Sequence, residues 1–441
     1  MAGEYIDINT QDGDTFRAYL SLPPRGKGPG IVLCHEIFGA NATMRELADI
    51  YAAEGYVVAV PDLYWREEPG LEFDYTSGDW QRAFALSQSY DFDLGVDDVA
   101  ATLATLRARP EVESETTASI AAQQAASQVR TEQDEDIATG PIRRHLPGGT
   151  SVVGFSLGGR LAYLAGCRLE GVSCAASFYG TGLEDILDEA KNLRGRLVIH
   201  LPENDKFVRT EAQHQILARF ESSRNVEVYV YPRVDRGFSR RGTESYDRPA
   251  STIAHQRTMA ALKREMGPYF NLSRLWDAHL RHALETKDID KLMAGMVADP
   301  VVNHVPTRTG GTGREKVRDF YENHFIGKLP VDLRMTAISR TVGASQLIEE
   351  VVMSFTHSTV IDWLLPGVAP TNRYVELPMV AVVSYRGDKL LRLQTYWDQA
   401  SVLVQIGRLE ADALPVAGIE CARKLVNEDL PSNELIARTP V

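Results

Sequence analysis

The chain has 441 residues, of which 44% are hydrophobic and 24% charged, as is typical of a globular protein with an ample core. Its formal net charge of −13 argues against a surface that binds nucleic acid or an anionic membrane. No apolar run approaches the ~20 residues of a membrane span, and the N-terminus carries no signal-peptide pattern. The cysteines, which form no CxxC pair and have no metal-like spacing with histidine, are Cys34, Cys167, Cys174 and Cys421. We therefore expect buried thiols, no bound metal, and a cytoplasmic protein of two or three domains.

Alternating strand and helix patterns dominate the first part of the chain. Residues 5–22 alternate apolar and polar side chains around Asp12-Gly13, which predicts a hairpin. The elements expected next, in chain order, are a buried strand at 31–34, a helix over 44–55, a second buried strand at 56–61 and one amphipathic helix over 79–108. This order is typical of a parallel α/β sheet.

Residues 110–148 interrupt that order. They are rich in Glu, Ser, Thr, Ala and Gln and contain no aromatic residue. We expect an exposed insertion there or, as the functional alternative, a lid over the site. Beyond the insertion the expected strands are at 175–180, 197–201 and 226–231, and a helix follows at 251–266. Gly267-Pro268 then marks the end of a first domain, 1–268.

The segment Val152–Arg160 organises this first domain. Two β-branched residues run into Gly-x-Ser-x-Gly, and a helical pattern follows, which predicts a strand, a sharp turn and a helix. Such a turn forces its central residue into a strained backbone and makes that side chain stand clear of the sheet. Ser156 is therefore the candidate nucleophile.

From about residue 272 the pattern changes to helices followed by long strands. Helices are expected at 275–285, 289–296 and 314–325, with a glycine-rich loop at 310–313. The long strands are expected at 332–340, 346–356, 374–385 and 389–397. Helices followed by a curved antiparallel sheet predict an α+β cone over 272–411. A tail, 412–441, is helical at most.

Four segments of the first domain occur in a fixed order: His35-Glu36-Ile37-Phe38-Gly39, the Tyr-Asp-Phe-Asp-x-Gly segment at 90–95, Gly154-Phe155-Ser156-Leu157-Gly158-Gly159, and Asp205-Lys206-Phe207-Val208. With them, the domain resembles the dienelactone hydrolase branch of the α/β-hydrolases. The resemblance implies a mostly parallel sheet with helices on both faces. It also implies attack of a nucleophile, usually cysteine in this family, on an ester or lactone carbonyl, without a cofactor.

The resemblance assigns roles by position. Ser156 takes the place of the nucleophile and Asp205 that of the orienting acid. The main-chain amides of Ile37 and Leu157 would form the oxyanion hole, where negative charge develops. The residues implied in substrate binding or catalysis are Glu36, which matches the family's glutamate near the nucleophile, Arg240, which matches a substrate-carboxylate arginine, and Arg82, which lies near a second one. Both arginines could instead be solvated surface charges.

Two departures from the family pattern affect the mechanism. The nucleophile is serine, which needs an adjacent base. The position of the family's histidine is occupied by Arg236, which stays protonated and cannot be that base. We expect Arg236 to form a salt bridge with Asp205. The alternatives for the base are His35, which lies beside the oxyanion turn, His200, His255, and Glu36 if burial raises its pKa. Otherwise the fold persists as a binding or scaffold domain.

The second domain contains Asp299-Pro300-Val301-Val302-Asn303-His304-Val305-Pro306, Gly313-Arg314-Glu315-Lys316-Val317 with Tyr321, and Tyr396-Trp397-Asp398-Gln399. With these segments it resembles the NTF2-like, SnoaL-type cone, which implies a deep apolar pocket with a few polar groups. The pocket candidates are His304, Tyr321, His357, Asp362, Trp363, Trp397 and Asp398. A His/Asp pair in an apolar cone can do acid–base chemistry, but these side chains could equally satisfy buried hydrogen bonds.

The sequence thus favours a cofactor-free hydrolase that acts on a small ester, lactone or activated carbonyl compound through Ser156. The alternatives are isomerase, lyase or cyclase chemistry in the second-domain pocket with a degenerate hydrolase domain, or a non-enzymatic binding protein. The expected partner is a small-molecule substrate, and a homodimer is expected by analogy with other cones.

Overall fold

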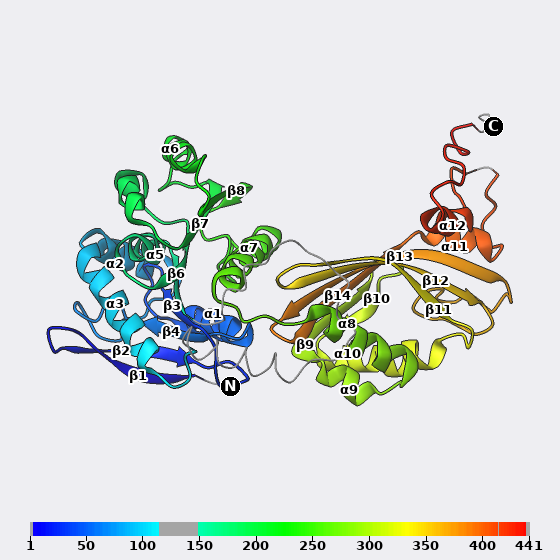
Figure 1. Cartoon of the computed structure of the whole chain (residues 1–441), viewed down its shortest axis with the longest axis horizontal. Helices are drawn as coiled ribbons and strands as arrows, with labels where there is room; N and C mark the ends of the chain where they lie inside the picture. Colours follow the sequence, from blue (N-terminus) through cyan, green and yellow to red (C-terminus); the bar gives the residue numbers. More distant parts are fainter. Residues whose placement is uncertain (1–2, 114–148, 413, 438–441) are drawn as a thin grey trace, which may run out of the picture. The chain divides into compact units, whose positions relative to one another are not determined.

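The computed structural model describes residues 3–113, 149–412 and 414–437. The chain divides into two compact units, Met1–Tyr269 and Phe270–Val441 (Figure 1). Most of the insertion predicted at 110–148 lies outside the described residues. In the part of the chain that is described, no helix is long and apolar enough to cross a membrane.

The first unit is built on an eight-stranded sheet with the order β1-β2-β4-β3-β5-β6-β7-β8. Its strands are β1 (Glu4–Asn9), β2 (Thr15–Ser21), β3 (Gly30–Cys34), β4 (Val57–Pro61), β5 (Thr150–Phe155), β6 (Val172–Phe178), β7 (Arg196–Asn204) and β8 (Val226–Asp235). Strands β1 and β2 form the predicted hairpin, and every pair from β4 to β8 is parallel. The fold is that of the α/β-hydrolases, with the carboxyl ends of the parallel strands along one edge.

Helices cover both faces of this sheet. They are α1 (Ala42–Ala53), α2 (Ser77–Gln88), α3 (Phe92–Ala108), α5 (Leu157–Arg168), α6 (Thr210–Phe220) and α7 (Arg248–Met266), with a 3₁₀ helix at Glu184–Asn192. In Figure 1, α2, α3 and α5 lie on one side of the central strands, and α1 and α7 on the other.

The strand sequences explain the two-sided packing. Val32 in β3 belongs to the core with α3 and α5, while its neighbours Ile31 and Leu33 belong to the core with α1 and α7. All five residues of β3 and of β4 are buried. Continuous apolar runs of this kind suit parallel strands that are covered on both faces.

The single helix predicted over 79–108 is wrong in one respect. The structure has two helices, α2 and α3, with a break at Ser89–Asp91. Asp91 caps the second helix: its side chain accepts from the amides of Asp93 and Leu94. An aspartate in extended backbone starts a new helix, and periodicity alone does not report such a break.

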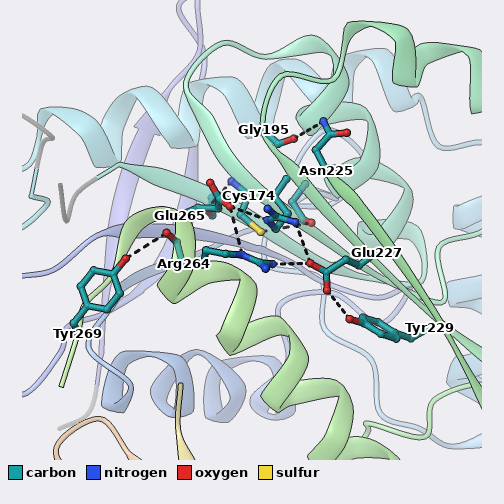
Figure 2. Close-up of polar contacts among 11 residues, drawn as sticks. Cys174, Gly195, Asn225, Glu227, Tyr229, Arg264, Glu265 and Tyr269 are labelled. Atoms are coloured by element: carbon teal, nitrogen blue, oxygen red, sulfur yellow. Dashed lines mark hydrogen bonds and ion pairs between the residues drawn. The ribbon is translucent and has the colours of Figure 1, made fainter. Parts of the chain in front are cut away.

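A network of charged side chains ties the last strands of the sheet to α7 (Figure 2). Arg196, at the start of β7, contacts Glu265 at 2.7 Å and Glu227 at 3.0 Å. Glu227 also binds Arg264 at 2.6 Å and accepts from the Tyr229 hydroxyl at 2.5 Å. These contacts hold the end of the first unit on its sheet.

The second unit has a curved six-stranded sheet with helices packed against it (Figure 1). The sheet order is β10-β9-β14-β13-β12-β11. Its strands are β9 (Met296–His304), β10 (Thr309–Thr312), β11 (Arg334–Val342), β12 (Gln346–Thr356), β13 (Tyr374–Arg386) and β14 (Lys389–Trp397). Its helices are α8 (Leu272–Leu280), α9 (Ile289–Ala294), α10 (Arg314–Phe320), α11 (Gln399–Gln405) and α12 (Glu420–Val426), with π-helical turns at Arg281–Glu285 and Tyr321–Phe325 and a 3₁₀ turn at Ile326–Lys328.

The four predicted strands lie within a few residues of their predicted positions, but two further strands, β9 and β10, were missed. The glycine-rich segment predicted as a loop at 310–313 is largely strand β10, which pairs with β9. Gly310 explains why: a Cβ there would lie 2.1 Å from the carbonyl oxygen of Val302. The glycines let two backbones pair closely and are not a sign of an open loop.

Candidate functional site

Ser156 is the turn between β5 and α5. Its backbone has φ of 56° and ψ of −114°, a strained combination for a residue with a side chain. The flanking glycines make the turn possible. A Cβ on Gly154 would lie 1.8 Å from the carbonyl oxygen of Gly158, and one on Gly158 would lie 2.3 Å from that of Cys34. The strand, turn and helix have the geometry of a nucleophile elbow.

Arg236 is the direct polar partner of the Ser156 side chain. One guanidinium nitrogen, Nη2, donates to Ser156 Oγ at 2.9 Å and to the carbonyl oxygen of Tyr179 at 2.6 Å. The other, Nη1, donates to Asp205 Oδ2 at 2.8 Å. The predicted salt bridge between Arg236 and Asp205 is therefore present, and the same guanidinium reaches the serine.

Asp205 is held rigidly at the end of β7. Its Oδ1 accepts from the amides of Phe207 at 2.9 Å and Val208 at 3.3 Å, and its side chain has no exposed surface. The Arg236 side chain is only 14% exposed. A buried ion pair with this many hydrogen bonds fixes the position of both partners. The aspartate orients a cation here, where the family has an imidazole.

Glu36 follows β3 and is 3% exposed. Its Oε1 accepts from the Tyr179 hydroxyl at 2.9 Å, and its Oε2 binds Arg240 Nε at 2.7 Å. Burial raises the pKa of Tyr179, so this phenol is a neutral donor. Tyr179, which the sequence analysis did not single out, therefore links the two clusters, because its carbonyl oxygen also accepts from Arg236.

The three candidate histidine bases are all engaged away from Ser156. His35 is fully buried, with Nδ1 2.6 Å from the carbonyl oxygen of Glu36 and Nε2 3.1 Å from the amide nitrogen of Leu63. The two nitrogens of His200 lie 2.8 Å from the Tyr231 hydroxyl and 2.9 Å from that of Thr258. His255 Nε2 lies 3.6 Å from Glu54. The alternative of a displaced histidine as the base is therefore not supported, because both nitrogens of His35, the best-placed candidate, are engaged.

Comparison with known proteins covers the same part of the chain as these contacts. The model of the dienelactone hydrolase family matches residues 16–266. The chain belongs to the dienelactone hydrolase family. A carboxymethylenebutenolidase of Pseudomonas sp. strain P51 is 33% identical over 267 residues, which are 60% of this chain and 96% of that protein. The carboxymethylenebutenolidase of Pseudomonas putida is 28% identical over 260 residues, or 59% and 95% of the two chains.

Among solved structures, the dienelactone hydrolase of Anabaena variabilis aligns with a TM-score of 0.40 at 12% identity and covers 60% of this chain and 100% of that one. The family and its carboxymethylenebutenolidase members support a hydrolase, and they do not favour the alternative of a degenerate hydrolase domain. The family match ends at residue 266, before the second unit begins.

The oxyanion donors expected in this chain are the main-chain amides of Ile37 and Leu157, next to the elbow. The turn that contains Ile37 packs on the start of α5, where the Gly158 amide donates to the carbonyl oxygen of His35 at 3.1 Å. Among the described residues, the amides of Ile37 and Leu157 donate no hydrogen bond within the protein. Both are thus available to an oxygen of a ligand.

The predicted role of Arg82 is not supported. Its side chain is 59% exposed and pairs at 2.5 Å with Glu68, which is 57% exposed. The alternative of a solvated surface charge describes it better. Arg240, by contrast, lies over the rings of Phe38 and Tyr75, with Cζ 5.1 and 4.8 Å from the ring centroids.

An aromatic run leads from the surface to Arg236. Trp80 stacks on Phe84 with ring centroids 5.0 Å apart, Phe84 lies 6.0 Å from Phe207, and Arg236 Cζ lies 5.1 Å from the Phe207 ring. Trp80 and Phe207 are 41% and 43% exposed. Neither Trp80 nor Phe84 was predicted as part of the site. Their spacing of four residues on α2 was the signal, because it puts both rings on one face.

In the second unit the structure brings together only part of the predicted pocket. His304, Tyr321 and Trp363 line a cavity there, and the other four predicted residues do not. His357 lies 3.1 Å from the Thr371 hydroxyl, Asp362 contacts Lys328 and His324, Trp397 donates to Gln399, and Asp398 caps α11. His357 and Asp362 both follow the end of β12 at Thr356, each contacts other residues, and neither lines the cavity.

The cavity also contains polar residues that the sequence analysis missed. His279 on α8 lies 3.3 Å from the Tyr321 hydroxyl, and Glu349 on β12 accepts from Trp276 Nε1 at 2.6 Å. Among the described residues, no group of three or more His, Cys, Asp or Glu side chains is placed to hold a metal ion.

Proposed function

We propose that the first unit hydrolyses a small ester or lactone with Ser156 as the nucleophile. The observation that carries this proposal is the elbow itself, in which a strained serine stands beside two main-chain amides that have no acceptor within the described protein. In the proposed reaction Oγ attacks the carbonyl carbon and loses its proton to a base. The oxyanion that forms accepts from the amides of Ile37 and Leu157. Collapse of this intermediate breaks the ester C–O bond, the leaving oxygen takes the proton, and water then releases the acid from Ser156.

Arg236 cannot accept the proton of Ser156, so its role in this proposal is electrostatic. Its Nη2 lies 2.9 Å from Oγ, and a fixed cation at that distance lowers the cost of forming negative charge on the oxygen. Asp205 holds the guanidinium in place. The pair would thus stabilise the serine oxygen without relaying a proton.

Glu36 is the proposed base. The histidine candidates are occupied, and Asp205 is bound by Arg236 and two amides. Glu36 lies in the turn that packs on the start of α5, and each of its carboxylate oxygens keeps a lone pair beyond the contacts to Tyr179 and Arg240. A substrate carboxylate that competes for Arg240 would release one of these oxygens.

The substrate class that we propose is a small carboxylate-bearing or aryl ester or lactone. Two cations, Arg236 and Arg240, lie near the elbow. The exposed ring of Phe207 adjoins Arg236, and Phe84 connects it to the exposed ring of Trp80. The relatives named carboxymethylenebutenolidase support an unsaturated lactone within this class. For the second unit we propose an NTF2-like cone, a proposal supported by its helices, its curved sheet and its internal cavity.

The test combines covalent labelling of Ser156 with a comparison of two serine-to-alanine variants. A serine-reactive aryl phosphonate should add to Ser156, as read by peptide mass spectrometry. Ser156→Ala should lose both the label and at least ~10³-fold in kcat/KM on 4-nitrophenyl acetate. Ser177→Ala is the control, because Ser177 is also fully buried, lies on the next strand, β6, and has an Oγ with no partner among the described residues. A Ser156→Ala variant as active as Ser177→Ala would rule out the serine mechanism.

A further inference from the structure

The second unit encloses a cavity of about 60 Å³ between α8, the turn after α10 and the sheet. Its inner wall includes fully apolar positions on three strands: Val351, Ala381 and Leu393. Half-buried leucine and methionine side chains, Leu284, Leu333 and Met335 among them, complete its outer part. The walls are therefore apolar, and the outer side chains are of the kind that adapts to a ligand.

Two buried polar atoms that belong to residues lining this cavity have no partner in the described protein. They are Nε2 of His304 and Nε1 of Trp363, in residues that are 4% and 3% exposed. The two rings are neighbours, with centroids 4.9 Å apart. Buried polar groups are nearly always hydrogen-bonded, so two unsatisfied ones on adjacent rings of one cavity point to a bound oxygen atom.

The position of His304 follows from strand register. His304 ends β9 opposite Thr395 of β14, and its Nδ1 lies 2.5 Å from the Thr395 hydroxyl. The contact fixes the plane of the imidazole, so Nε2 has a defined direction. The Trp363 ring contacts Phe325 at 5.1 Å between centroids as well as His304, and the carbonyl oxygen of residue 363 is bound by Thr307 and Thr309. Both unsatisfied nitrogens are thus held in place.

Among the described residues that line it, the cavity has no free charge to offer a ligand. Burial lowers the pKa of His304 to about 3 and that of His279 to about 4, so both imidazoles are neutral at neutral pH. The carboxylate of Glu349 is bound by Arg340 at 2.5 Å and by Trp276 Nε1. Moving an ion from water into these surroundings would cost several kcal/mol without a counter-charge.

We propose that this cavity is a binding site for a small neutral molecule that carries a hydroxyl group on a planar apolar body, of the phenol class. The hydroxyl oxygen accepts from Trp363 Nε1–H and the hydroxyl proton is donated to His304 Nε2, so that one group satisfies both atoms. The apolar ring lies between Phe325 and the outer leucines. A ring needs more room than the cavity now has, since an apolar cavity of about 150 Å³ admits benzene. The half-buried side chains, Met335 among them, therefore move aside on binding.

The experiment is calorimetric titration of the full chain with phenol, benzene and benzoate at pH 7. We expect saturable phenol binding with a Kd on the order of 1 mM, weaker binding of benzene and none of benzoate. Trp363→Phe keeps an aromatic ring but removes the N–H donor, and should weaken phenol binding about five-fold without affecting benzene. Tyr385→Phe is the control, because it removes a buried hydroxyl of the same unit that has no partner among the described residues and does not line the cavity.

A third variant keeps the test decisive if Trp363→Phe folds poorly. Ala381→Leu fills the inner wall of the cavity and should abolish phenol binding while the circular dichroism spectrum is retained. The proposal is overturned if wild-type protein shows no saturable phenol binding, which would leave water as the occupant. It is also overturned if Trp363→Phe and Tyr385→Phe bind phenol equally, or if the filled variant still binds it.

Discussion

The two units bury polar groups in opposite ways. Around Ser156 the buried groups are charged and joined: Arg236 binds Asp205, and Arg240 binds Glu36. In the second-unit cavity the rings are neutral, and His304 and Trp363 each keep an atom without a partner in the described protein. Charge held by fixed partners is suited to stabilising charge in a reaction, whereas a neutral cavity with unmet hydrogen bonds is suited to holding a neutral ligand. This difference is the basis for proposing chemistry at the first site and ligand binding at the second.

The largest effect expected in this comparison concerns the proposed base. Glu36→Gln keeps an oxygen that can accept from Tyr179 but removes the carboxylate, so kcat on a small lactone should fall at least ~10²-fold. The measurement is a pH–rate profile of both proteins. Glu170→Gln, which changes a glutamate that is 84% exposed in the turn after α5, is the control and should leave kcat unchanged. If Glu36→Gln keeps wild-type kcat, Glu36 is only a partner of Arg240 and the base lies elsewhere.

The next effect concerns how much the buried ion pair between Asp205 and Arg236 contributes to the free energy of unfolding. Asp205→Ala leaves the Arg236 guanidinium, 14% exposed, without its counter-ion, and should lower the free energy of unfolding by about 3 kcal/mol. Urea denaturation measures this change. Glu68→Ala removes the exposed partner of Arg82 and should change stability within error, since both side chains of that pair are more than half exposed. Equal losses of stability in Asp205→Ala and Glu68→Ala would mean that the buried ion pair stabilises the fold no more than the exposed one.

Much of the first unit could be predicted from the sequence because its signals are local. The elbow needs Gly154 and Gly158 for steric reasons, and those glycines are visible in the chain. Continuous apolar runs such as β3 identify strands covered on both faces. The replacement of histidine by Arg236 and its pairing with Asp205 also followed from the motif positions.

The remaining features depend on contacts between distant segments. Nothing in the sequence near His35 reports that the amide of Leu63 occupies its Nε2. The link through Tyr179 joins β3, β6 and the loop after β8, and each contact spans more than 50 residues. In the second unit, the sequence does not report that His357, which directly follows β12, contacts Thr371 and lies outside the cavity.

The pH dependence of stability tests whether His304, in the second-unit cavity, is neutral in the folded protein. Burial lowers the pKa of His304 from 6.5 to about 3, so between pH 6 and 4 the unfolded chain binds about one more proton at this residue. Stability should therefore fall as the pH drops through this window. His304→Gln should remove roughly 1.4 kcal/mol per pH unit from the slope. Asn303→Gln, at the preceding position of β9, changes no titrating group and should leave the slope unchanged. Parallel slopes for both variants would mean that His304 is protonated as easily in the folded protein as in the unfolded chain.

The smallest effect separates substrate binding from catalysis at the charged site. If the aromatic run next to Arg236 receives an aryl group, Trp80→Ala should raise KM for an aryl ester about five-fold and leave kcat unchanged, because the ring contributes binding and touches no reacting atom. Trp80→Phe keeps a ring to stack on Phe84 and should restore most of the KM. An alkyl ester of the same acid should be insensitive to both changes. Steady-state kinetics with the paired esters measures this. An equal rise in KM for alkyl and aryl esters would show that Trp80 stabilises the conformation of α2 and does not contact the substrate. A rise for the aryl ester alone would mean that the charged site binds part of its substrate at the protein surface, unlike the neutral cavity.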